Sequence, residues 1–500
     1  MAYLVPLGLL VLAWAMTTPP WAGPDEAAQY IKALGTVSAN PIGHGAVWVE
    51  PEVPMTPAQR AYFGDTSRRF PIDPKLAPRV PTIPCFAYHP SRSAACATNE
   101  ARGPAQDIAY VGTYQPVYFV LPGLAAHLAG SPAGGLRAAR LTGALEFLAL
   151  VGGALALLDR RGKCPPPIGV LLVLTPMTLS LGGVVNSSGF EVAAAVLFMC
   201  SCVRVAERPP TPTLLAVFVG SGTLLAWSRP LGPLWVAGGL VVAGVLAGWT
   251  VVASRARDHW VRPAAAALTA LTLASGVWDL ALGFGSGVAR SSLPTAIHDL
   301  IHLATTLFQQ QIGVFGFLDT VLPKPVYVAC EVLAAALLIT ALVLGRARQR
   351  LALVAGIAFY VLVTLVVFVT TTKTGFPVQG RYFLPLWAFV AVLMGETLGG
   401  AALLRGYGVV LRRLVTIGVV AFAALNVGSV YVNARRYAVG TAGPELFFRH
   451  PAWTPPGGWY LWLGVLALSG LGLVITGLTE IVPRRGEEAD QVLAGGPTRP

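Results

Sequence analysis

The feature that most constrains this chain is a series of long apolar runs separated by short stretches that carry arginine. Each run has roughly 18 to 22 residues, the length that an α-helix needs to cross the hydrocarbon core of a bilayer. Only 12% of the 500 residues are charged, about half the share that is typical of soluble domains. The sequence therefore predicts an all-α polytopic membrane protein.

We predict about twelve transmembrane helices, near 2–18, 138–158, 166–185, 189–206, 213–228, 231–252, 263–283, 326–345, 351–370, 383–403, 414–431 and 459–481. The first lacks the basic residues that open a signal peptide, so we interpret it as an uncleaved anchor. Residues 114–130 are apolar, but counting them as a span would invert every later loop against its charge. We expect an interfacial or re-entrant helix there.

The basic residues predict which helix ends face the cytoplasm. A cluster of arginine or lysine follows every even-numbered span, as Arg160, Arg161 and Lys163 follow the second. By the positive-inside rule these loops and both termini are cytoplasmic, and the arginine-rich composition favours a bacterial cytoplasmic membrane. The net charge of +12 is dispersed among these loops, so we expect no nucleic-acid partner.

One membrane domain is predicted over 1–482, followed by a cytoplasmic tail, 483–500, that we expect to be disordered. The long connections, 19–137, 284–325 and 432–458, all fall on the extracytoplasmic side. Long ordered loops often carry function, so chemistry is expected on that side, although the loops could merely cap the bundle. Cys85 and Cys96 lie in the first of these loops, where oxidation is possible, and we predict a disulfide between them.

Two adjacent carboxylates, Asp25 and Glu26, follow the first span in the stretch TTPPWAGPDEAAQYIKAL. A carboxylate at a membrane boundary can accept a proton from a hydroxyl nucleophile. Adjacent side chains point in different directions, so one would act while the other binds or positions the substrate. The alternative is that Asp25 only caps a helix that lies along the surface.

Three cations on the same side suit a phosphate group attached to a lipid. They are Lys373 and Arg381, in TTKTGFPVQGRYFLPL, and Arg229, in WSRPLGPLW. A guanidinium matches the geometry of phosphate oxygens, and the aromatic neighbours suit an interface. The alternative is that these side chains only extend from the interface toward water.

Other polar side chains are expected to line one outward cavity and to bind substrate. Carboxylates within a membrane usually face such a cavity or a partner. His298 and His302 stand four residues apart, but no HExxH glutamate accompanies them, so we predict no metal site there. The predicted substrate-binding residues are Tyr30, Asn186, Glu191, Gln379 and Tyr382.

An ordered set of motifs over roughly 14–400 resembles the domain-of-unknown-function 2142 family of bacterial membrane proteins. The motifs are PPWAGPDEAAQY, YQPVYFVLPG, LTPMTLSLGGVVNSSGFEVAAA, SRPLGPLW, GVFGFLDTVLP and VQGRYFLPL. That family in turn resembles the GT-C superfamily of glycosyltransferases, which use sugars linked to polyprenyl phosphate and carry an acidic catalytic motif in the first outward loop. The resemblance implies a GT-C-like fold in which Asp25, rather than Glu26, is the catalytic carboxylate. The NSSGFE turn departs from the acidic YD version of many relatives.

The function implied is transfer of a sugar from a polyprenyl-phosphate donor to a cell-envelope glycan or lipid acceptor, with inversion, on the extracytoplasmic face. A Mg²⁺ or Mn²⁺ ion could assist, but no residue pattern requires a metal. The alternatives are a transporter or flippase of lipid-linked saccharides and a non-catalytic scaffold of the cell envelope. A transporter predicts two related halves and charge near the bilayer midplane, and neither pattern is evident. Neither the sugar nor the acceptor, nor the oligomeric state, follows from the sequence.

Overall fold

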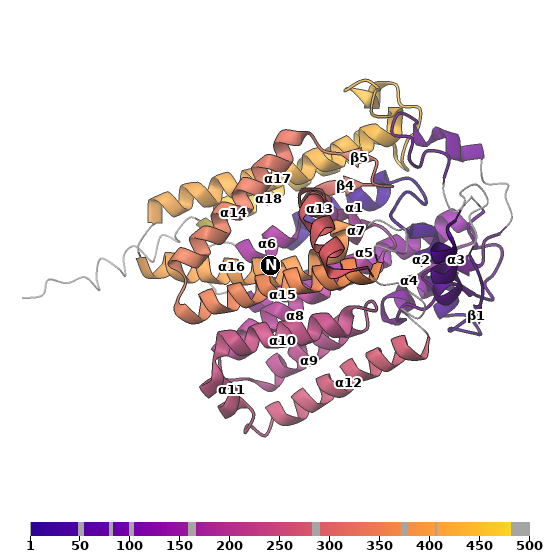
Figure 1. Ribbon diagram of the computed structural model, residues 1–500. Coiled ribbons are helices and arrows are strands. Elements are labelled where there is room, and N and C mark those ends of the chain that lie inside the picture. The colour runs from indigo at the N-terminus through magenta and orange to yellow at the C-terminus, as the bar shows by residue number, and fades with distance from the viewer. Residues whose placement is uncertain are drawn as a thin grey trace, which may run out of the picture.

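The computed structural model describes residues 2–48, 55–79, 84–99, 105–158, 167–282, 291–371, 378–405 and 408–481. Helices dominate, and most run side by side as one bundle (Figure 1). The predicted tail, 483–500, lies outside the described residues. The longer helices of the bundle are α5 Pro132–Leu158, α8 Ser187–Glu207, α9 Pro212–Ala226, α10 Gly232–Ala247, α12 Val261–Ala281, α14 Lys324–Leu344, α15 Ala347–Thr371, α16 Leu384–Arg405, α17 Gly408–Val439 and α18 Gly458–Ile481.

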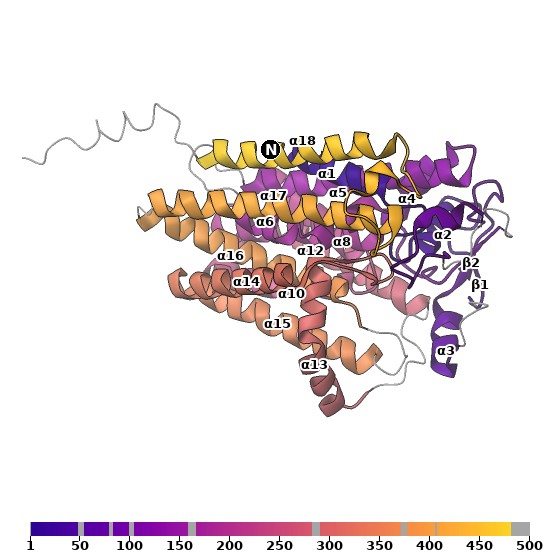
Figure 2. The ribbon, with the colours of Figure 1, turned by 90° about the horizontal axis from the view of Figure 1, so that it is seen from above.

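The remaining elements complete the fold. They are α1 Leu4–Thr17, α2 Glu26–Thr36, α3 Pro57–Thr66, α4 Val117–His127, α6 Ile168–Val173, α7 Pro176–Gly183, α11 Trp249–Arg255 and α13 Leu293–Gly313, with the 3₁₀ turns η1 Ala94–Asn99, η3 Gly380–Phe383 and η4 Phe447–Arg449. Strands β1 His44–Gly45, β2 Arg68–Arg69 and β3 Ile108–Ala109 form an antiparallel sheet, and β4 Val314–Phe315 pairs with β5 Thr320–Val321. Figures 1 and 2 show α2, α3 and the first sheet gathered at one end of the bundle, which we call the loop end.

The structure confirms an all-α polytopic membrane protein but not the predicted count of twelve spans. In the part of the chain that the structure describes, eight helices are long and apolar enough to cross a bilayer. Helices α10 and α11 would add a ninth if this pair, bent by 112°, forms one span. The span predicted at 166–185 consists of two short helices, because the chain breaks before Pro176, which cannot donate a backbone hydrogen bond.

The segment 114–130 folds as the short helix α4 at the loop end. Its 11 residues reach only about 16 Å at the helical rise of about 1.5 Å per residue. A helix of that length is too short to cross a bilayer. This agrees with the charge pattern of the later loops, which argued against a membrane span at 114–130. Helix α13, which carries His298 and His302, lies across the direction of the bundle helices (Figure 2).

Helix α8 lies at the centre of the bundle, with 89% of its apolar stretch buried. Close helix packing depends on small residues: a Cβ at Gly395 of α16 would collide with the backbone of Gly169 in α6. At the loop end, Cys85 and Cys96 form the predicted disulfide. Buried Arg436 of α17 donates to the carbonyls of Phe86 and Arg92 in the same loop, which ties the loop to the bundle.

Candidate active site

Asp25 stands at the start of α2 in a left-handed conformation, with φ of 57°. This conformation is uncommon for residues other than glycine, but aspartate tolerates it. Its side chain makes no capping hydrogen bond to α2, so the alternative of a simple helix cap does not hold. The carboxylate instead accepts hydrogen bonds from Tyr110 Oη at 2.8 Å and from Arg381 Nη2 at 2.6 Å. The side chain remains 34% exposed and can therefore be reached by a substrate.

Arg381 reaches Asp25 from 356 residues away, because η3 is held against α13. The Gly380 amide donates to Gln310 Oε1 at 2.6 Å, and a Cβ at Gly380 would collide with the Leu307 carbonyl. The guanidinium of Arg381 is nearly buried and lies 5.5 Å from the ring centroid of Tyr382. Helix α13 thus fixes the position of the cation that binds the exposed carboxylate.

Arg229, in the turn between α9 and α10, joins the same cluster. It donates to Ser188 Oγ at 2.7 Å and to Tyr114 Oη at 3.2 Å. Its guanidinium lies 5.5 Å from the ring centroid of Tyr382, the same separation as that of Arg381. Burial opposes the charged form of Arg229, but the neighbouring Tyr114 and Glu191 outweigh burial and raise its pKa. The structure therefore brings Asp25, Arg229, Arg381 and Tyr382 together.

Both arginines keep one donor without an acceptor. The Nε atoms of Arg229 and Arg381 are buried, and neither has a hydrogen-bond partner in the part of the chain that the structure describes. A buried donor left unpaired costs about 1–3 kcal/mol. The Oε1 atom of Gln379, which directly precedes η3, is also buried without a partner among the described residues. The cluster thus has spare hydrogen-bonding capacity where two positive charges meet.

Two predicted substrate-binding residues support the cluster instead of facing a ligand. Glu191 is buried, accepts from Trp235 Nε1 at 2.8 Å and lies 3.5 Å from Arg229. Asn186 is also buried, caps α8 through Ser188 N, and donates to the Pro24 carbonyl at 2.6 Å. Through the Pro24 carbonyl, Asn186 positions the backbone just before Asp25. Its buried side chain leaves no exposed group for a substrate.

Glu26, predicted as the second catalytic candidate, has a structural role in this fold. Its side chain is fully buried and forms a two-pronged ion pair with Arg140, at 2.7 and 2.6 Å. The amide of Val185 donates to the same carboxylate at 3.1 Å. Arg140 also donates to the carbonyls of Ala15, in the last turn of α1, and of Thr18 and Pro19, just after it. Glu26 thus holds α2 against the bundle and offers no free oxygen to a substrate.

Tyr30 is likewise not available to a substrate. Its ring is completely buried, 5.3 Å from the ring of Trp21, and its hydroxyl faces Gly135 of α5. Tyr30 lies five positions after Asp25 on α2, a short helix whose residues are all buried. Lys373, the third predicted phosphate ligand, lies outside the described residues.

Two tyrosines of the site were not singled out from the sequence. Tyr110 donates to Asp25, and Tyr114 accepts from Arg229. Burial and the adjacent Asp25 carboxylate raise the pKa of Tyr110 well above its usual value, so its hydroxyl stays a donor. The only local signal was the pair of tyrosines in AYVGTYQP, four residues apart, which does not indicate a contact with residues 25 and 229.

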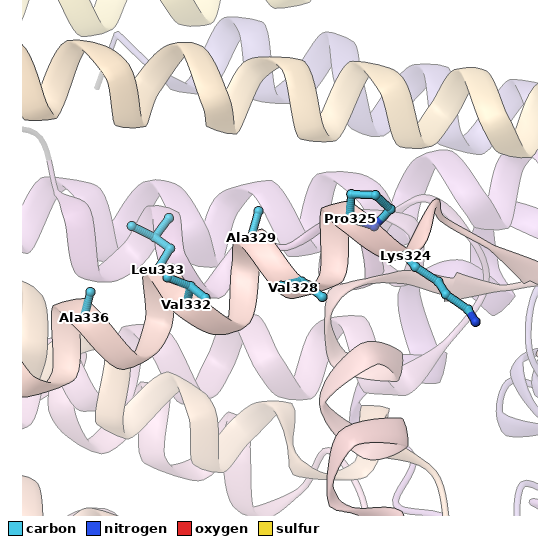
Figure 3. A pocket seen from close by; sticks show the side chains of 7 residues that line it. All are labelled: Lys324, Pro325, Val328, Ala329, Val332, Leu333 and Ala336. Atoms are coloured by element: carbon cyan, nitrogen blue, oxygen red, sulfur yellow. The ribbon is translucent and has the colours of Figure 1, made fainter.

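An apolar groove on α14 is separate from this cluster. Seven residues between Lys324 and Ala336 line it, and Figure 3 shows the Lys324 side chain at one end of the row. The face is almost entirely aliphatic, which is the surface expected of a helix that contacts lipid chains. Among the described residues, no group of three or more His, Cys, Asp or Glu side chains could hold a metal ion.

The fold and this cluster define a class: a polytopic α-helical membrane protein with an acidic and basic site built around its first loop. Residues 7–390 match the family model described as "Predicted membrane protein (DUF2142)", and the chain belongs to this family. The family predicted from the motifs is thereby confirmed. No curated protein matches the chain at a significant level.

Two crystal structures of ArnT from Cupriavidus metallidurans show a distant likeness. The apo structure is 14% identical and covers 76% of this chain and 68% of that chain, with a TM-score of 0.35. The structure bound to undecaprenyl phosphate is 13% identical and covers 99% of this chain and 79% of that chain, with a TM-score of 0.40. Scores this low do not support an assignment of site or activity.

Proposed function

We propose that this protein is a membrane glycosyltransferase that transfers a sugar from a polyprenyl-phosphate donor to a cell-envelope acceptor on the extracytoplasmic face. The observation that carries the proposal is the pairing of a partly exposed carboxylate with two arginines, of which Arg381 is buried and Arg229 is partly buried. Asp25 and Arg381 lie 2.6 Å apart, and Arg229 and Arg381 flank the same Tyr382 ring. The motif resemblance to GT-C enzymes, with their acidic first loop, points to the same chemistry.

In the proposed reaction, Asp25 accepts the proton of an acceptor hydroxyl. The hydroxyl oxygen attacks the anomeric carbon and forms the new glycosidic bond. The bond from that carbon to the phosphate oxygen breaks, and its electron pair leaves with the polyprenyl phosphate. A single displacement of this kind inverts the anomeric centre. No metal ion is needed to balance these steps.

The two arginines would stabilise the charge that develops on the departing phosphate. Fixed cations act most strongly where charge grows in the transition state, and here they are already oriented by Ser188, Tyr114 and Asp25. The unpaired Nε donors of Arg229 and Arg381 support an anionic ligand, since phosphate oxygens would satisfy them. Arg381 would then share its charge between the phosphate and Asp25.

The test is transfer of a radiolabelled sugar from polyprenyl-phosphate donors to cell-envelope acceptors by the purified protein in vesicles. We expect Asp25→Asn to lower the rate by about 10²- to 10⁴-fold, the usual contribution of a general base. Asp107→Asn is a matched control, because Asp107 lies in the same loop in an exposed ion pair with Arg69. Addition of EDTA would show whether Mg²⁺ or Mn²⁺ assists.

Normal transfer by Asp25→Asn would remove the catalytic assignment. If the wild-type protein transfers no sugar from any donor but moves lipid-linked saccharides across vesicles, the protein is a transporter. If it does neither, the scaffold alternative is favoured.

A further inference from the structure

Three aromatic rings meet beside Asp25 at the loop end. Trp48 follows β1, Phe63 belongs to α3, and Tyr110 follows β3. Their ring centroids are separated by 4.7, 5.1 and 5.6 Å, and each pair meets at an angle of 61–65°. We call these three residues the aromatic cluster. Three segments of the first loop thus converge on one apolar surface.

Tyr110 of the aromatic cluster and Arg381 bind different oxygens of the Asp25 carboxylate. Tyr110, a member of the cluster, donates to Oδ1 of Asp25, whereas Arg381 donates to Oδ2. A group bound on the arginine side and a group bound on the aromatic side would therefore both lie within reach of Asp25. In a single displacement the nucleophile and the leaving group must lie on opposite faces of the reacting carbon.

The cluster is anchored on one side and accessible on the other. Trp48 and Tyr110 are only half-buried, so part of their surface remains accessible. Phe63 is buried, and Tyr110 packs against the edge of the main hydrophobic core, so these two rings hold the cluster in place. Binding sites typically combine rigid aromatic surface with a few placed polar groups, and here the Tyr110 hydroxyl and the Asp25 carboxylate bonded to it supply such groups.

We propose that the aromatic cluster binds the pyranose ring of the acceptor and presents one of its hydroxyls to Asp25. A pyranose has an apolar face of C–H groups that packs on an aromatic ring, and its rim of hydroxyls suits a neighbouring carboxylate. The phosphate of the donor would lie on the other side, at the arginines. This inference rests on the proposed function and adds to it the class of acceptor, a glycan, and the surface that holds it.

The kinetic test compares Trp48→Ala with wild type in the transfer assay. We expect the KM for the acceptor to rise about three- to tenfold, from the worth of one aromatic contact. The KM for the donor and the rate at saturating acceptor should change little. Trp48→Phe should keep most of the acceptor affinity. Trp249→Ala is the matched control, since Trp249 is 81% exposed on α11, outside the cluster.

A binding test separates this inference from the proposed function. Saturation-transfer NMR would be recorded on the purified protein with a panel of free oligosaccharides, in a detergent without a sugar headgroup. We expect ring protons of at least one glycan to receive saturation from wild type and from Trp249→Ala, but not from Trp48→Ala. Equal thermal unfolding of the variants would exclude a folding defect, and Trp48→Phe provides a second variant if Trp48→Ala is unstable.

Glycan binding that depends on Trp48 supports the site even if no sugar transfer is found. A raised KM for the donor, with the KM for the acceptor unchanged, would overturn the assignment to the acceptor. Failure of every glycan to bind wild type, or equal binding by Trp48→Ala and wild type, would overturn the proposal altogether.

Discussion

At the scale of single residues, the adjacent carboxylates Asp25 and Glu26 lie in different environments. Asp25 turns outward to Tyr110 and Arg381, whereas Glu26 turns inward to Arg140. The left-handed backbone at Asp25 separates the two side chains. One carboxylate is therefore available for chemistry because the other anchors the helix that follows. Each role predicts a different consequence of removing the charge.

Glu26→Gln should destabilise the protein by about 3–5 kcal/mol, the usual cost of leaving a buried ion-pair partner uncompensated. The change leaves the Arg140 charge buried beside the end of α1. Thermal unfolding of the purified protein measures the effect, with Asp107→Asn, which removes an exposed ion pair with Arg69, as the control that should unfold near the wild-type temperature. A stable Glu26→Gln protein that has lost only activity would restore Glu26 as a catalytic candidate.

Lys32 of α2 predicts a pH dependence of stability. Its side chain is completely buried, its Nζ lies 5.1 Å from the Phe70 ring centroid, and Nζ has no hydrogen-bond partner among the described residues. Burial, together with the nearby Arg68 charge, lowers the pKa of Lys32 to about 7. Between about pH 7 and pH 10.5 the unfolded chain therefore binds more protons at Lys32 than the folded protein does, so the free energy of unfolding rises with pH in this window.

Lys32→Met should accordingly be more stable than wild type near pH 7, by on the order of a few kcal/mol. The difference should shrink as pH rises and vanish above about pH 10.5, where the lysine is neutral in both states. Unfolding temperatures measured across this range test the prediction, with exposed Lys75→Met as the control. A stability difference that does not depend on pH would contradict it.

At the scale of elements, the position of Arg381 depends on two segments that never touch the carboxylate. Helix α13 lies across the bundle and supplies Gln310 and Leu307, against which η3 is seated. Thr175, at the break between α6 and α7, donates to the Gln311 carbonyl at 2.7 Å and fixes the same end of α13. The broken span and the crossing helix thus act together to place one guanidinium.

Gly380→Ala should weaken donor binding without altering any side chain of the site. A methyl group there collides with the Leu307 carbonyl and displaces η3, and a shift of about 1 Å in a positioned group can cost up to about 10²-fold in rate. Transfer rate and the KM for the donor are the readouts. Gly220→Ala is the control, since a Cβ there meets no atom within 4 Å. Wild-type kinetics in Gly380→Ala would show that η3 need not be held by α13.

At the scale of the whole molecule, the site exists only at the loop end of the bundle. Its residues come from the first long loop, from α8, from the turn after α9 and from η3. The positive-inside pattern predicts that this end is extracytoplasmic, which suits a donor in the outer leaflet. Whether the site faces the outer leaflet therefore depends on which side of the membrane the loop end occupies.

Single cysteines introduced at exposed positions would determine this sidedness. Thr441→Cys, at the end of the bundle where α17 finishes, should react with a membrane-impermeant maleimide in intact cells. Pro209→Cys, in the turn between α8 and α9, should react only after the membrane is permeabilised. The background is the protein with Cys164 and Cys330 replaced by serine, because Cys330 is partly exposed and Cys164 lies outside the described residues, whereas the free cysteines at 200 and 202 are buried. The reverse labelling pattern would invert the topology.

The sequence by itself determined the features that depend on local composition. Apolar length predicted membrane helices, charge argued against a span at 114–130, and the position of Cys85 and Cys96 in an outward loop predicted their disulfide. Residue chemistry also selected Asp25, Arg229, Arg381 and Tyr382, because charged groups at membrane boundaries are costly and few. The number of spans was harder to predict from the sequence, because a break within an apolar run does not change its hydropathy.

Only the tertiary structure decided which of the selected residues face one another. Glu26 and Asn186 carry a carboxylate and an amide, groups that a binding site could use. In the folded protein, however, these groups are bound to Arg140 and to the Pro24 carbonyl. Tyr110, Trp48 and Phe63 gained significance only when three separate segments met beside Asp25. The physical reason is that composition sets the cost of placing a group in a membrane, whereas partners brought from distant positions in the chain decide whether that group is buried and paired or remains free to react.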